Sequence, residues 1–135
     1  MFSFLTGTTI TNFYAHDDII NKALFANNQL ITVSSDQTLR IWDLKGKNVK
    51  DPLILYDHEE EIIAASVQKS AFASMDTNGT VLIRDLTNSQ NTTNQYNVAK
   101  GGANFETGFL LFNYQVANEI FIFFNNELEV YDGKG

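Results

Sequence analysis

The chain has 135 residues, of which 44% are hydrophobic, a content typical of one globular domain rather than a disordered segment. Its formal net charge of −7 argues against nucleic acid as a ligand, because nucleic-acid binding depends on cations placed against phosphates. The chain contains no cysteine, which excludes disulfides and thiolate metal sites, and its longest uninterrupted apolar run, residues 120–124, is too short to span a membrane.

The N-terminal segment, residues 1–7, has no basic residue and only a short apolar part, unlike a secretory signal peptide. Together with the lack of cysteine, this pattern leads us to expect a cytoplasmic protein.

Short apolar runs separated by Asn, Gly and Ser predict strands along the whole chain. No window of helix length keeps a period of 3.6 residues, so we expect an all-β fold. The predicted strands are residues 8–13, 19–25, 29–33, 38–42, 53–56, 62–67, 71–75, 80–84, 95–98, 109–112, 120–124 and 127–131.

The strands recur with a period of 42 residues. His16 and His58 are separated by this interval, and residues 38–44, ending in Trp-Asp-Leu, return as residues 80–86, ending in Arg-Asp-Leu. A weaker third copy lies at residues 127–132. Periods of this length are typical of repeat architectures. We therefore predict one domain, residues 1–135, with repeat units at about 8–46, 51–88 and 94–135.

The best-preserved copy, residues 34–44, is a polar turn followed by a short alternating strand that ends in Trp-Asp. Together with a histidine twenty residues before the turn aspartate, it resembles the WD40 repeat. The resemblance implies blades of four antiparallel strands in a β-propeller, each locked by a hydrogen-bonded series of four side chains. Here these are His16, Thr32, Asp36 and Trp42. The alternative is that Trp42 only fills the core and His16 lies in a loop.

The second repeat departs from this pattern, with His58, Ser74, Asn78 and Arg84 at the equivalent positions. A guanidinium accepts no hydrogen bond and keeps its charge, so the interlock must be altered. We expect Asp76 or Asp85 to be the partner of Arg84. The third repeat has Phe121, Asn125 and Tyr131 at the equivalent positions and no histidine, so we expect the interlock to be lost there.

Three blades are too few for a closed propeller, which needs about four to eight. We expect the chain to be part of a larger closed propeller, with the other blades supplied by the same longer chain. The alternative is a second copy of this chain.

Both histidines stand beside carboxylates, a pattern that also suits a metal site or acid–base catalysis. The repeat accounts for these histidines, and the sequence has no phosphate-binding loop and no nucleophile motif. We predict no catalytic activity, no cofactor and no metal.

Acidic residues occupy equivalent loops of the first two repeats, and these loops would lie on one face of the propeller. We predict that this face recognises a basic peptide or protein, whereas the alternative is that the acids only provide solubility. The candidate residues are Asp17, Asp18, Glu59, Glu60, Glu61 and Asp76.

The WD40 resemblance implies a scaffold that mediates protein–protein interaction. Residues 15–20 and 30–36 are also similar to the C-terminal propellers of BEACH-domain proteins, which are linked to vesicle and lysosome traffic. The competing interpretation is a purely structural segment of a large assembly, without a ligand site of its own.

Overall fold

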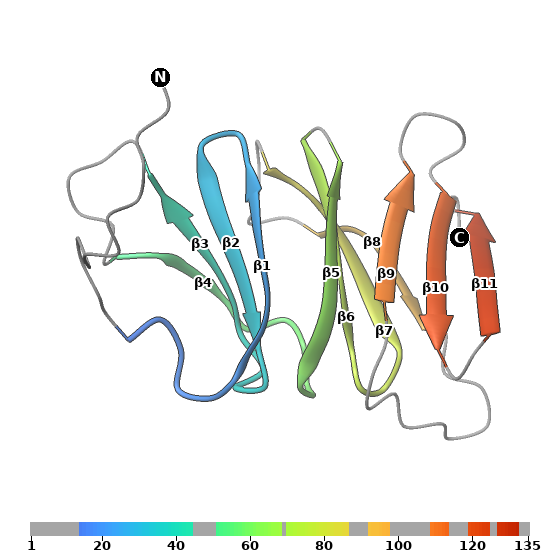
Figure 1. The fold of residues 1–135 in the computed structure, drawn as a ribbon, viewed down its shortest axis with the longest axis horizontal. Coiled ribbons are helices and arrows are strands. Elements are labelled where there is room, and N and C mark those ends of the chain that lie inside the picture. Colours follow the sequence, from blue (N-terminus) through green and yellow to red (C-terminus); the bar gives the residue numbers. More distant parts are fainter. Residues whose placement is uncertain are drawn as a thin grey trace, which may run out of the picture.

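The computed structural model describes residues 14–44, 51–68, 70–86, 92–97, 109–113, 119–124 and 127–132. Within these ranges the chain forms three antiparallel sheets that stand side by side along the long axis of the molecule (Figure 1). The first sheet contains β1 (Ile20–Ala26), β2 (Gln29–Ser34), β3 (Leu39–Asp43) and β4 (Leu53–Leu55). The second contains β5 (Ile62–Gln68), β6 (Ala71–Asp76), β7 (Thr80–Asp85) and β8 (Thr92–Asn97). The third contains β9 (Phe109–Asn113), β10 (Glu119–Phe124) and β11 (Glu127–Asp132).

The prediction of an all-β fold made of antiparallel blades is confirmed. The strand predicted at residues 8–13 lies outside the described residues. The strand predicted at residues 95–98 instead begins at Thr92, because the polar residues before Gln95 pair with the outer edge of β7. No helix among the described residues has the length and apolar character needed to cross a membrane.

The sheets are shifted by one strand relative to the predicted repeat units. The period groups residues 53–55 with the second unit, yet β4 pairs with β3, placing Leu55 opposite Leu39 in the first sheet. In the same way β8 pairs with β7 and completes the second sheet. Each of these outer strands follows the third strand of its own sheet, so hydrogen bonding, not the sequence period, defines the blade.

The 42-residue period is also present in the backbone geometry. A bulge interrupts the pairing of β1 with β2 between Ile20 and Lys22, and its equivalent interrupts β5 with β6 between Ile62 and Ala64. At the first bulge, Asn21 donates its side-chain N–H to the Ile62 carbonyl oxygen over 2.8 Å, which joins neighbouring sheets. The repeat therefore determines local irregularities as well as strands.

The turns between the second and third strands of the first two sheets also match. Gln37 has a φ of 69° and Gly79 a φ of 80°, and the two residues are 42 positions apart. This left-handed conformation is easy for glycine but costs energy for Gln37. The tight turn between β1 and β2 uses Asn27 and Asn28, also with positive φ, as asparagine tolerates.

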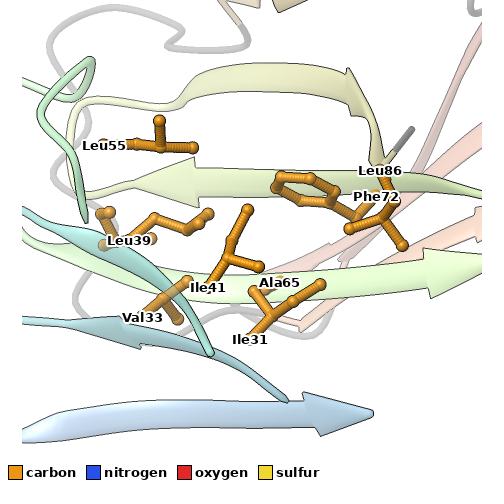
Figure 2. Packing of buried hydrophobic residues seen from close by; sticks show 9 residues of the cluster. Ile31, Val33, Leu39, Ile41, Leu55, Ala65, Phe72 and Leu86 are labelled. Atoms are coloured by element: carbon orange, nitrogen blue, oxygen red, sulfur yellow. The ribbon is translucent and has the colours of Figure 1, made fainter. Parts of the chain in front are cut away.

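The described core lies between the first and second sheets (Figure 2). Alternate residues of β2 and β3 point toward the second sheet, while Thr32 and Trp42 belong to the opposite face of these strands. Burying such side chains stabilises the stack by about 1.5–3 kcal/mol each. The cluster consists of Ile31, Val33, Leu39, Ile41, Leu55, Ile62, Ala65, Phe72 and Leu86.

Candidate functional site

In the first sheet, the four side chains of the predicted series meet. The indole N–H of Trp42 donates to Thr32 Oγ1 over 3.0 Å, and Thr32 Oγ1 lies 2.7 Å from His16 Nε2. On the other side of the ring, His16 Nδ1 lies 2.9 Å from Asp36 Oδ2. The series thus connects β3, β2, the loop before β1 and the turn between β2 and β3.

The hydrogen-bond partners of His16 indicate which ring nitrogen carries the hydrogen. An ionised carboxylate only accepts hydrogen bonds, so Nδ1 carries the hydrogen that faces Asp36. In the neutral ring Nε2 is then an acceptor, and it receives the Thr32 hydroxyl hydrogen. The Thr32 oxygen in turn accepts from Trp42. Every polar group of this buried series has a partner, as burial requires.

Asp36 is held by its own turn. Its Oδ1 accepts from the Thr38 hydroxyl at 2.6 Å and from the Thr38 backbone N–H at 2.9 Å, and its Oδ2 accepts from the Asp17 N–H at 3.0 Å. Burial favours the neutral acid and would raise the pKa of Asp36. The hydrogen bonds from Thr38, Asp17 and His16 outweigh burial and hold that pKa well below its usual range.

The second sheet has an equivalent series with a different carboxylate. His58 Nε2 lies 2.8 Å from Ser74 Oγ, and His58 Nδ1 lies 2.9 Å from Asp76 Oδ2. Asp76 Oδ1 also accepts from the backbone N–H groups of Asn78 at 3.0 Å and Thr80 at 2.9 Å. The structure therefore places Asp76, and not the predicted Asn78, against the histidine; Asn78 is exposed and contributes its backbone.

Strand alternation explains this difference. Asp76 ends β6 two residues after Ser74, so both side chains lie on the same face of the strand and both reach His58. Two-residue spacing from a predicted strand serine was the signal that could have identified it. Asn78 lies 42 residues after Asp36, but the period compares positions in the turn and does not specify on which face of the strand a side chain lies.

Arg84 is buried at the position that Trp42 occupies in the first repeat, with 2% of it exposed. Its guanidinium forms an ion pair with Asp57, a residue that sequence analysis did not single out and that differs from the expected partners Asp76 and Asp85. Burial lowers the pKa of Arg84. The available signal was position, because Asp57 stands directly before His58 as Ala15 stands directly before His16.

The acidic loops lead into β1 and β5 at the same end of the two sheets, where these strands begin (Figure 1). Five of the six candidate acids lie there, all exposed except the half-buried Glu60: Asp17, Asp18, Glu59, Glu60 and Glu61. Asp76 must be removed from the candidate face, because only 1% of it is exposed and its carboxylate is engaged by His58. We call these five residues the acidic loop face.

Hydrogen bonds hold the acidic loop face to the sheets. The Asp17 N–H is bound to Asp36, and the Thr77 N–H donates to the Glu61 carbonyl oxygen over 3.0 Å. The Asp17 side chain is 93% exposed and has Arg40 Nη2 at 3.5 Å. Among the described residues no group of three His, Asp or Glu side chains is arranged to hold a metal ion. The geometry is therefore that of a charged surface on a fixed backbone.

The predicted loss of the interlock in the third repeat concerns side chains outside the described set. The backbone places Phe121 in β10 and Tyr131 in β11, and Asn125 lies outside the described residues.

Comparison with known proteins gives a partial match. No family model matches the chain. It is 33% identical over 88 residues to WD repeat and SOCS box-containing protein 1 of Takifugu rubripes, a match that covers 60% of this chain. The match spans only 20% of that protein's length. It supports the WD40 resemblance, with which the antiparallel sheets of three and four strands agree; the narrower resemblance to BEACH-domain proteins receives no support from it.

Proposed function

We propose that the chain is a non-catalytic scaffold module, built of WD40-type blades, that binds a basic peptide or a basic patch of a partner protein through the acidic loop face. Support for a protein-interaction module in general comes from the likeness to a WD-repeat protein. The finer proposal rests on one observation, the equivalent placement of exposed acids on neighbouring blades.

Charge balance on these loops favours a cationic partner. Residues 14–19 and 56–61 carry six carboxylates and no Lys or Arg, and the two nearby arginines are already engaged. Arg40 faces Asp17 and Asp36, and Arg84 faces Asp57. A basic segment would therefore meet a surface that stays net negative, which steers association and gives it a strong salt dependence.

Backbone hydrogen bonds already hold the acidic loop face to the sheets. The Ser35 N–H donates to the Ile19 carbonyl oxygen over 3.0 Å, as Thr77 does to Glu61 in the second sheet. A loop that is held in place before binding loses less conformational entropy when a partner arrives. This pre-organisation is the physical advantage that a propeller gives to a binding loop.

Fluorescence anisotropy with a labelled Lys/Arg-rich peptide tests the proposal. We expect binding that weakens as salt rises, and a loss on the order of tenfold in affinity for the variant Asp18→Asn/Glu59→Gln/Glu61→Gln. Asp43→Asn is the matched control, because Asp43 is exposed at the opposite end of β3. Absent or salt-independent binding would reject the proposal and favour the alternative, a purely structural propeller segment of a large assembly.

We also propose that further blades complete the propeller, supplied by the same longer chain or by a second copy. Three sheets among the described residues are fewer than the four or more that closure requires. Light scattering on the purified chain distinguishes the sources, since a folded dimer favours a second copy and a monomer favours the longer chain.

A further inference from the structure

Two positions, one of them buried, change together between the first and second repeats. In the first, Ala15 precedes the histidine and Trp42 is the last residue but one of the third strand; in the second, the same positions hold Asp57 and Arg84. Trp42 and Arg84 are both almost completely buried, with 1% and 2% exposed. A small apolar residue with an indole has thus been replaced by an acid with a guanidinium.

Arg84 lies at the junction of two blades. It stands opposite Phe72 in the pairing of β6 with β7, and paired residues share one face of a sheet. Phe72 belongs to the core between the first and second sheets, together with Ile41. Arg84 therefore projects from the face of the second sheet that is directed at the first.

Asp57 lies on the connection that joins these two sheets. It falls between Leu55, the last residue of β4, and Ile62, the first residue of β5. Its side chain is 44% exposed, so the ion pair with Arg84 extends from the edge of the acidic loop face into the interior. A buried guanidinium requires such a carboxylate, because transfer of an isolated charge from water is strongly unfavourable.

We propose that Asp57 and Arg84 form an exchangeable unit that replaces Ala15 and Trp42, and that this unit fastens the connection before β5 to the second sheet. In the first repeat the indole N–H is tied to Thr32, which is tied to His16. In the second, Arg84 instead makes an ion pair with Asp57, the residue directly before His58. Each repeat keeps its histidine in place with a different pair of residues.

We expect single substitutions of Asp57 and Arg84 to lower the thermal stability by unequal amounts. Asp57→Ala removes the carboxylate that pairs with the buried guanidinium of Arg84, so we expect the midpoint of thermal unfolding to fall by about 10 °C. Arg84→Trp leaves an aspartate that is already half exposed and can stay hydrated, so its loss is smaller, about 5 °C.

The double variant Asp57→Ala/Arg84→Trp restores the residue types of the first repeat and provides an indole N–H for Ser74, which stands where Thr32 does. Replacing a buried ion pair by apolar residues is often neutral or stabilising. We expect the unfolding midpoint of the double variant to lie within about 3 °C of that of the original chain, a much smaller loss than the sum of the two single losses.

The experiment is thermal unfolding of the complete 135-residue chain, followed by circular dichroism. Asp18→Ala/Arg84→Trp is the matched control; it removes an exposed acid of the equivalent loop and should add to Arg84→Trp without rescue. If Asp57→Ala does not fold, recovery of the β-sheet spectrum in the double variant supports the proposal. Additive losses in Asp57→Ala/Arg84→Trp, single variants without effect, or rescue by Asp18→Ala would overturn it.

Hydrogen exchange adds a readout specific to the connection. Asp57→Asn should speed amide exchange in residues 58–62 at least several-fold more than in residues 16–20, the equivalent stretch of the first repeat. Equal acceleration in both stretches would show a general loss of stability and contradict the local fastening.

Discussion

The first and second sheets perform the same local task with different residues. In both, a histidine is held between a hydroxyl on the second strand and a carboxylate. In the first sheet the carboxylate comes from the turn, as Asp36, whereas in the second it comes from the end of the strand, as Asp76. What the two blades share is therefore a hydrogen-bonding pattern, and the residue position that satisfies it can move by two.

The two series also differ in their contact with water. The Asp76 side chain is 2% exposed and that of Asp36 is 8% exposed, with Arg40 beside it at 3.5 Å. The second repeat has the buried Leu82 where the first has Arg40. The first network thus reaches the surface through charged groups, while the second is closed, so equivalent substitutions should have unequal costs.

The largest difference is expected for the two aspartates. Asp76→Ala removes the acceptor of His58 Nδ1 and of two backbone N–H groups in a closed site, so we expect a loss of about 3–5 kcal/mol in the free energy of unfolding. Asp36→Ala should cost less, about 1–3 kcal/mol, because water can reach the freed donors. Denaturant titration of both variants measures the difference, and equal losses would contradict the distinction between a closed and an open network.

The next largest effect is expected for the hydrogen bond that joins Trp42 to the first series. Trp42→Phe removes the N–H donated to Thr32 but keeps most of the apolar bulk, so we expect a loss of about 1–2 kcal/mol. Thr32→Val removes the shared hydroxyl and serves as the second arm of a double-mutant cycle. Coupling between the two changes is expected; strictly additive losses would mean that the indole acts only as a core filler.

Acid should weaken the first network through Asp36. The pKa of Asp36 is lower in the folded chain than in the unfolded chain, so its stabilisation is complete above about pH 4, the ordinary value for aspartate, and is lost as the pH falls further. One group contributes at most about 1.4 kcal/mol per pH unit. Unfolding of the parent chain between pH 5 and 2.5 should therefore be steeper than that of Asp36→Asn, and identical slopes would exclude this contribution.

The smallest effect is expected at the charged edge of the first network. Arg40 lies 3.5 Å from Asp17, whose side chain is almost fully exposed, and such pairs contribute about 0–1 kcal/mol. Arg40→Gln should therefore lower the unfolding free energy by about 0.5 kcal/mol, and less in high salt. A loss comparable to that of Trp42→Phe would show that Arg40 is an integral member of the series.

Sequence reasoning was sufficient where information is local or periodic. The alternation of apolar residues located the strands, and the resemblance to the WD40 repeat placed His16, Thr32, Asp36 and Trp42 in one expected series, whose hydrogen bonds the structure contains. Both signals are written along the chain, since side-chain direction in a strand follows from position alone.

Other features depended on which segments meet in space. The hydrogen bonds between β3 and β4 assign residues 53–55 to the first sheet, although the period had grouped them with the second. Asp76 reaches His58 because it lies on the same face of β6 as Ser74, a placement that the comparison of turn positions does not reveal. Asp57 meets the buried Arg84, which lies 27 positions later in the sequence, because the two sheets stack. Periodicity identifies equivalent positions, but only the packed fold decides which neighbours satisfy the charge or hydrogen bond at each of them.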